Sequence, residues 1–149
     1  MIDSFIPIVA WGFYAFHFSV DRKYMELPNG VNGAIALSAI STLYIQNHSV
    51  GLMESGLVTA VILFVVFLLF ALLGPMGGGD IKMMAATGLF FVVWDIPSLL
   101  FFGFLIGTIQ GVALMMIHKQ KKDTLFAFGP ALILGILMVV FIKGGGVIV

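Results

Sequence analysis

The sequence predicts an all-α polytopic membrane protein with six transmembrane helices in a single domain, residues 1–149. Only 9% of its residues are charged and 61% are hydrophobic, whereas about 25% of an ordinary soluble domain is charged. A transmembrane helix needs about 20 largely apolar residues, with a range of roughly 17–25. Five charge-free stretches are long enough for one span each: 4–20, 27–53, 55–79, 96–118 and 124–142. A sixth charge-free stretch, 83–94, is marginal in length.

These stretches place the spans, in chain order, at about 3–20, 31–47, 54–73, 81–96, 98–117 and 124–142. The first is expected to be a retained span rather than a secretory signal peptide. It has Asp3 in place of a basic region, and Asp21-Arg22-Lys23 follows without a small-residue cleavage site.

Glycine and proline mark the ends of several spans. Leu27-Pro28-Asn29-Gly30 reads as a turn before the second span, and Gly74-Pro75 ends the third. Phe128-Gly129-Pro130 lies inside the sixth, where we expect a kink or a broken first turn because proline removes a helical hydrogen bond.

The positive charges fix an orientation. Lys143 alone falls on one side of the six spans, and six of the seven basic residues fall on the other: Arg22, Lys23, Lys82, Lys119, Lys121 and Lys122. Because cytoplasmic loops carry the Lys/Arg excess, both termini of this multi-pass protein are expected outside. Lys119, Lys121 and Lys122 also suit anionic lipid headgroups.

A carboxylate at the edge of this membrane domain is the most informative single feature. Asp80 follows 25 uncharged residues, 55–79, and an ionisable group in a membrane segment is a functional-site hypothesis because it costs roughly 2.5–3.5 kcal/mol at a helix centre. Asp21 ends the first span and Asp80 opens the fourth, so two crossings return the chain to the same, cytoplasmic, face. If 80–94 were one helix, it would measure roughly 22 Å, which places Asp80 near or just inside the membrane boundary.

Two carboxyl groups a few ångströms apart cannot both ionise cheaply, so one keeps a proton. Such a pair hydrolyses amides as aspartic proteases do: the ionised acid takes a proton from water while the protonated acid donates to the carbonyl oxygen. The pair titrates as a unit, so neither Asp21 nor Asp80 is assigned as the fixed acid or base. This chemistry needs no metal and no other cofactor. The three histidines are scattered, cysteine is absent, and no basic surface suggests nucleic acid.

Each of these residues also has a simpler structural interpretation. Asp80 could be a helix N-cap and Asp21 an interfacial charge. The run Gly77-Gly78-Gly79 could be a flexible catalytic loop, which we favour, or a site of close helix packing. Lys82 could stabilise the ionised pair or extend to the lipid headgroups. Asp95 is expected to cap a helix in an outer turn, away from this chemistry.

Together these pieces resemble the type IV prepilin peptidases, membrane aspartyl proteases of the GxGD class. The matching pieces, which run along essentially the whole chain, are Asp21, Glu26-Leu27-Pro28-Asn29, Gly77-Gly78-Gly79-Asp80-Ile81-Lys82, and Phe128-Gly129-Pro130 with Gly135. The resemblance implies that the protein lies in a bacterial inner (plasma) membrane or an archaeal plasma membrane, and that Asp21 and Asp80 are the catalytic pair. The supporting residues would be Gly77, Gly78, Gly79, Lys82, Pro28, Asn29, Gly129 and Pro130.

The resemblance also implies a substrate: a pilin-like precursor, prepilin or preflagellin-like, whose short basic leader is cut off at the cytoplasmic face. The cut falls just before the precursor's hydrophobic helix, typically after a glycine. Larger relatives carry a cysteine-rich insert and methylate the new N-terminus. With no cysteine and a short connection after the first span, this chain looks like a peptidase-only form without N-methyltransferase activity. Leu27 and Met25 depart from the family's usual residues; cleavage is still expected, but the resemblance does not define the substrate preference.

Two other classes of function remain open from the residues alone. Membrane carboxylates commonly mark ion pathways, so a small proton- or cation-coupled transporter is one alternative, although such sites usually lie near the midplane. A non-catalytic subunit of a pilus or secretion assembly is the other. In each case membrane lipid is a partner.

Overall fold

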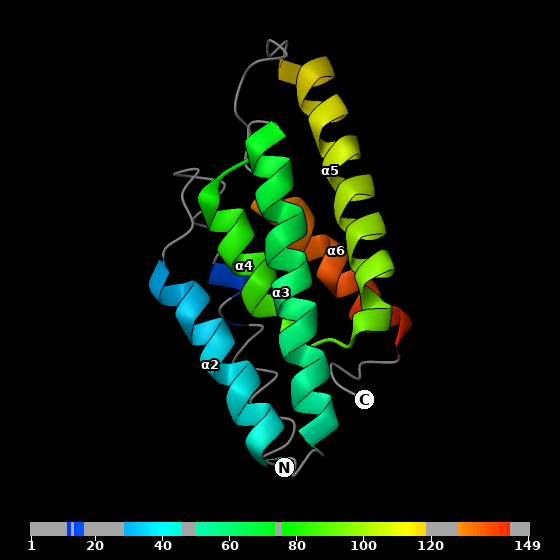
Figure 1. The fold of residues 1–149 in the computed structure, drawn as a ribbon. Coiled ribbons are helices and arrows are strands. Elements are labelled where there is room, and N and C mark those ends of the chain that lie inside the picture. The colour runs from blue at the N-terminus through cyan, green and yellow to red at the C-terminus, as the bar shows by residue number, and fades with distance from the viewer. Residues whose placement is uncertain are drawn as a thin grey trace.

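The computed structural model describes residues 12, 14–16, 29–45, 50–73, 76–118 and 128–143. Every regular element within these ranges is a helix, which confirms the all-α class (Figure 1). The elements are α2 (Asn29–Ile45), α3 (Val50–Leu73), α4 (Gly78–Gly88), the 3-10 turn η1 (Val93–Asp95), α5 (Ile96–His118) and α6 (Gly129–Ile142). Of the expected first span, residues 12 and 14–16 are described, and they are helical. The total of six spans stays a prediction.

Two of the described helices are long and apolar enough to cross a membrane, over Glu54–Leu73 and Val93–Leu114. The apolar helix α6 is shorter. Large apolar side chains cover the outer sides of all three helices; for example, Leu69, Ile109 and Phe141 are 53%, 61% and 81% exposed. An apolar surface of this extent is unusual on a soluble monomer, and it suits contact with lipid.

Helix α4 is the centre of one half of the bundle. Both α2 and α3 pack on it, while α5 packs chiefly on α6 (Figure 1). The α3–α4 contact is tight at Gly88, where a Cβ atom would lie 2.6 Å from the Cα atom of Ala60. The α5–α6 contact is equally tight at Gly135, where a Cβ atom would lie 2.7 Å from the backbone nitrogen of Gly103. Glycine is required at both crossings because backbone meets backbone.

A group of phenylalanines joins α3, α5 and the start of α6. Phe104 stacks on Phe67 with ring centroids 5.9 Å apart, and it also lies 5.9 Å from the ring of Phe128. The Phe128 ring occupies the space beside Gly107. Helix α6 therefore begins beside the middle of α5, about 16 Å before α5 ends at His118.

At Phe128-Gly129-Pro130, where a kink or a broken first turn was expected, the described helix α6 begins at Gly129. Pro130 lies in the first turn of α6, where its missing N–H would have no helical partner anyway. The amides of Ala131 and Leu132 donate to the Phe128 carbonyl at 3.0 and 3.2 Å. Gly129 and Pro130 are buried there.

The expected fourth span, 81–96, is wrong as a continuous helix. Helix α4 has only 11 residues and stops at Gly88. Beyond it, the amides of Phe90 and Phe91 donate to the carbonyls of Thr87 and Gly88, and both rings are buried. The chain stays apolar through this unwound stretch, so charge spacing alone gave no sign that the helix ends.

The other boundaries lie close to expectation. Helix α3 ends at Leu73, as expected from the Gly74-Pro75 signal. Asn29 and Gly30 were expected in a turn, but both are already helical and form the first turn of α2. Pro28, in the same expected turn, lies outside the described residues.

Candidate active site

The glycine run forms the start of a helix rather than a loop. Gly77 is the extended N-cap residue, with φ −74° and ψ 143°, and Gly78 and Gly79 are the first helical residues of α4. The expected flexible loop is therefore wrong for Gly78 and Gly79. Asp80 is the third helical residue, so it is not the N-cap, and its carboxylate lies where the positive end of the helix dipole favours negative charge.

The Asp80 side chain is buried, with 6% of its surface exposed. Its Oδ2 atom folds back toward the helix start, 3.7 Å from where a Cβ atom at Gly77 would stand. A Cβ atom at Gly78 would meet no described atom within 4 Å. The first turn of α4 therefore combines a buried carboxylate with open space over the adjacent backbone.

Asp80 is set back along the bundle from the end of α3. The carbonyl oxygen of Leu89 would be 2.9 Å from a Cβ atom at Gly56, so the end of α4 is level with that residue of α3. Asp80 lies about 13 Å back along α4, whereas α3 runs about 25 Å from Gly56 to its end. Asp80 is thus recessed by about 12 Å from the end of α3, and its depth in a membrane stays a prediction.

Asp21 lies outside the described residues, so the pairing of Asp21 with Asp80 stays a prediction. The expected first span is nevertheless fixed to α4 at one point. The hydroxyl oxygens of Tyr14 and Thr87 lie 2.7 Å apart in a buried contact. The Thr87 hydroxyl donates to the Met83 carbonyl at 2.8 Å, so it accepts its second hydrogen bond from Tyr14.

Polar side chains of α2 meet the start of α4. The Lys82 ammonium donates a 2.8 Å hydrogen bond to Oδ1 of Asn29, which brings together two of the expected supporting residues. The Asn32 amide donates a longer hydrogen bond, 3.5 Å, to the carbonyl of Gly79. The sequence reasoning missed Asn32; the available signal was its spacing of three residues from Asn29, which puts both on one helix face.

The opposite end of the bundle holds a separate polar contact. Asp95 accepts hydrogen bonds from the Val92 amide at 3.2 Å and from the Lys143 ammonium at 2.8 Å. The expected capping role of Asp95 is confirmed, and Lys143 lies at the same end of the bundle. In the described part of the chain, no three His, Cys, Asp or Glu residues gather as a metal site would require.

Comparison with known proteins gives one match. The profile of the type IV leader peptidase family matches residues 8–112 of this chain. The matched region includes Tyr14, Asp21 and all of α2, α3 and α4, but it ends before Phe128-Gly129-Pro130. No curated protein and no solved structure gives a significant match.

Proposed function

The chain belongs to the type IV leader peptidase family, and we propose that it is a membrane aspartyl endopeptidase that removes the short basic leader of pilin-like precursors with Asp21, Asp80 and a water molecule. The family is membrane-embedded, and its substrates in general are pilin-like precursors. The resemblance stated from the motifs is thereby confirmed at the level of the family. The residues that act, the face of the membrane and the absence of a methyltransferase activity belong to the proposal.

One observation carries the choice of residues: the hydrogen bond between Tyr14 and Thr87. Asp80 precedes Thr87 by seven residues on α4, and Asp21 follows Tyr14 by seven residues in the sequence. Seven residues are close to two helical turns of 3.6 residues, so Asp80 shares a helix face with Thr87, and Asp21 would share one with Tyr14 if the first span were helical that far. In the expected six-span topology the first span and α4 run in opposite directions. A helical first span would therefore carry Asp21 to the level of Asp80, on the facing side.

The proposed chemistry follows from that encounter. The two carboxyl groups share one proton and hold a water molecule between them. The ionised group takes a proton from the water as its oxygen attacks the carbonyl carbon of the leader peptide bond, and the other group protonates the carbonyl oxygen. The tetrahedral intermediate then collapses, the C–N bond breaks, and the departing amine takes a proton. The recess around Asp80 would keep bulk water from screening these charges.

The test uses conservative substitutions and a matched acid elsewhere. Asp21→Asn and Asp80→Asn should each abolish leader removal from a coexpressed pilin-like precursor, while the protein still inserts and folds. Asp95→Asn changes a carboxylate at the opposite end and should cleave normally. Normal processing by either Asp21→Asn or Asp80→Asn would reject the pair. Cleavage should also be insensitive to chelators, because the pair supplies both acid and base.

A second test asks whether the aspartates meet. Because the native chain has no cysteine, Asp21→Cys with Asp80→Cys gives a single pair of thiols. We expect a disulfide to form on mild oxidation and to shift electrophoretic mobility. A control pair, Asp21→Cys with Asp95→Cys, should not cross-link within one molecule. Equal behaviour of the two pairs would contradict the encounter.

A further inference from the structure

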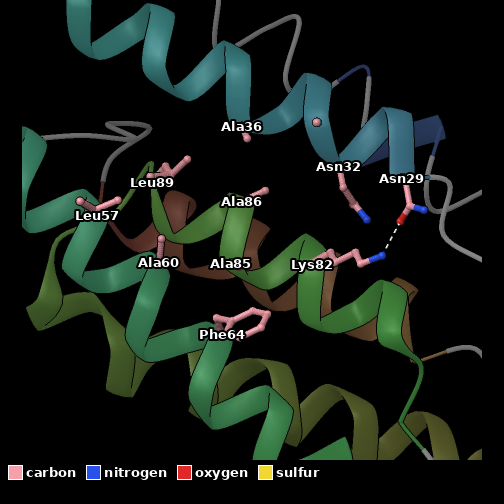
Figure 2. A pocket seen from close by; sticks show the side chains of 11 residues that line it. Asn29, Asn32, Ala36, Leu57, Ala60, Phe64, Lys82, Ala85, Ala86 and Leu89 are labelled. Carbon is pink, nitrogen blue, oxygen red and sulfur yellow. Dashed lines mark hydrogen bonds between the residues drawn. The ribbon is translucent and has the colours of Figure 1, made fainter.

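A cavity of about 540 Å³ lies beside the candidate active site, between α2 and α3 with α4 as its floor (Figure 2). Small residues line much of it: Gly33 and Ala36 from α2, Ala60 from α3, and Ala85 and Ala86 from α4. From each helix the lining covers seven residue steps, as in Asn29 to Ala36, or about 10 Å. The cavity is therefore a groove about two helical turns long, and we call it the α2–α4 groove.

The α2–α4 groove lies within the apolar part of the molecule. Its α3 wall runs from Leu57 to Phe64, inside the candidate membrane span Glu54–Leu73. Leu57 and Phe64 are 60% and 43% exposed, so the groove opens sideways toward lipid. A whole helix is about 10–12 Å across, and a groove of this volume holds the side chains of one helix face.

One end of the α2–α4 groove is polar. Asn29, Asn32 and Lys82 lie together there, whereas the other end is apolar (Figure 2). Asn32 is 95% buried, with 5% of its surface exposed. Its amide group faces the Gly79 carbonyl, which can only accept a hydrogen bond. The Asn32 Oδ1 atom is buried as well, and none of the described residues donates a hydrogen bond to it.

We propose that the α2–α4 groove receives the first turns of the precursor's hydrophobic helix, with Asn32 Oδ1 accepting a hydrogen bond from that helix's N-terminal backbone. This inference rests on the proposed function. A helix begins with four N–H groups that have no partner in the helix. In a membrane such groups are costly unless protein accepts them. An apolar helix thus supplies both the side chains and the donor that this groove lacks.

The position of the groove fits a cut just before that helix. The Asn32 side chain is bonded to Gly79, the residue next to Asp80. A precursor whose helix starts at Asn32 would pass its preceding residues over the first turn of α4 to reach Asp80. Gly78 leaves open space on that path. A lipid chain would fill the apolar part of the groove but would leave Asn32 Oδ1 without a donor.

Cross-linking tests the occupant. The probe is a synthetic precursor with a short basic leader ending in glycine and a 20-residue apolar helix, carrying one cysteine in the helix's first two turns. The enzyme, in nanodiscs, carries Asp80→Asn and either Ala36→Cys in the groove or Ile109→Cys on the outer side of α5. We expect at least tenfold more disulfide adduct at position 36, also with a probe that lacks the leader. Equal adduct yields at positions 36 and 109 would overturn the proposal that the α2–α4 groove binds the precursor's helix.

Kinetics give an independent readout. Ala85→Leu fills the groove floor and should raise the KM for the synthetic precursor about tenfold with little change in kcat. Ala113→Leu makes the same change on α5, outside the groove, and should leave both constants unchanged. An unchanged KM for Ala85→Leu, at normal thermal stability, would overturn the proposal.

The two proposals fail in different ways. If the wild-type enzyme cleaves the probe but position 36 gives no excess adduct, the groove is wrong and the peptidase stands. If position 36 gives the adduct but the wild-type enzyme does not cleave, the groove binds an apolar helix and the catalytic proposal is wrong.

Discussion

Tyr14 donates a buried hydrogen bond to the hydroxyl of Thr87, 73 residues further along the chain, at a distance of 2.7 Å. The contact fixes the expected first span against α4 two turns from Asp80. Because Thr87 itself donates to Met83, the pair of hydroxyl groups is oriented in one direction. The register of the proposed catalytic pair depends on this contact, and it is open to direct test.

Tyr14→Phe should lower the free energy of unfolding by about 0.5–1.5 kcal/mol, because one hydrogen bond is lost and Thr87 keeps its bond to Met83. Thr87→Val should cost more, about 1–3 kcal/mol, because it removes the Thr87 hydroxyl from two buried hydrogen bonds, with Tyr14 and with Met83. Both should slow leader cleavage. Thermal unfolding in detergent measures the loss of stability in both variants.

The control for these variants is Thr108→Val. Thr108 makes the same bond to the carbonyl four residues before it, at 2.8 Å, but it is exposed on α5. We expect little change in stability or cleavage. If Tyr14→Phe behaved like Thr108→Val in both measurements, the contact would not set the register.

Gly88→Ala should destabilise the protein by about 1–3 kcal/mol, since its Cβ atom would press on the backbone of Ala60 and force α3 and α4 apart. Gly78→Ala should instead leave stability equal or up to about 1 kcal/mol higher, because alanine is the better helix former and space is open there. We nevertheless expect Gly78→Ala to reduce cleavage at least tenfold. A stable and fully active Gly78→Ala enzyme would contradict the path of the substrate over this turn.

The bond between Lys82 and Asn29 should appear as a coupling energy. Lys82→Met and Asn29→Ala each remove it, so the double variant should lose less stability than the two single losses together. The expected difference is about 0.5–1 kcal/mol, since the contact is exposed. Strict additivity in a chemical or thermal unfolding series would show that the two side chains do not interact in solution.

The ion pair of Lys143 with Asp95 should matter for stability alone. Lys143→Met should lower the free energy of unfolding by at most about 1 kcal/mol, and less in high salt. Asp95 keeps its bond to the Val92 amide, so it is not left alone. Leader cleavage should be unchanged, because this contact lies at the other end of the bundle. Loss of cleavage in a folded variant would mean that the site reaches further than proposed.

The orientation can be checked with thiol labelling, since the native chain has no cysteine. Trp94→Cys replaces a side chain that is 89% exposed beside the Asp95 end. A membrane-impermeant maleimide should label it in intact cells. Lys119→Cys, expected in the cytoplasm, should be labelled only after permeabilisation. The reverse labelling pattern would show that the protein has the opposite orientation in the membrane.

The amino-acid sequence by itself determined the helical class, the end of α3 at Leu73, an interruption at Phe128-Gly129-Pro130 and the membership in a peptidase family. These follow from signals that are local in the chain: charge spacing, glycine and proline positions, and a motif around Asp80. It also placed Asn29 and Lys82 among the supporting residues, and the structure brings those two together.

Only the tertiary structure decided where α4 stops, how far Asp80 is set back from the end of α3 and which face of α2 lines a groove. Helix α4 ends where Gly88 meets Ala60, a contact between residues 28 positions apart that hydropathy cannot register because both sides are apolar. The role of Asn32 likewise depends on another helix, because its side-chain amide donates a hydrogen bond to the Gly79 carbonyl of α4. Membrane insertion depends on the average polarity of a segment, whereas packing depends on which backbone atoms can approach, and that is settled only when the helices meet.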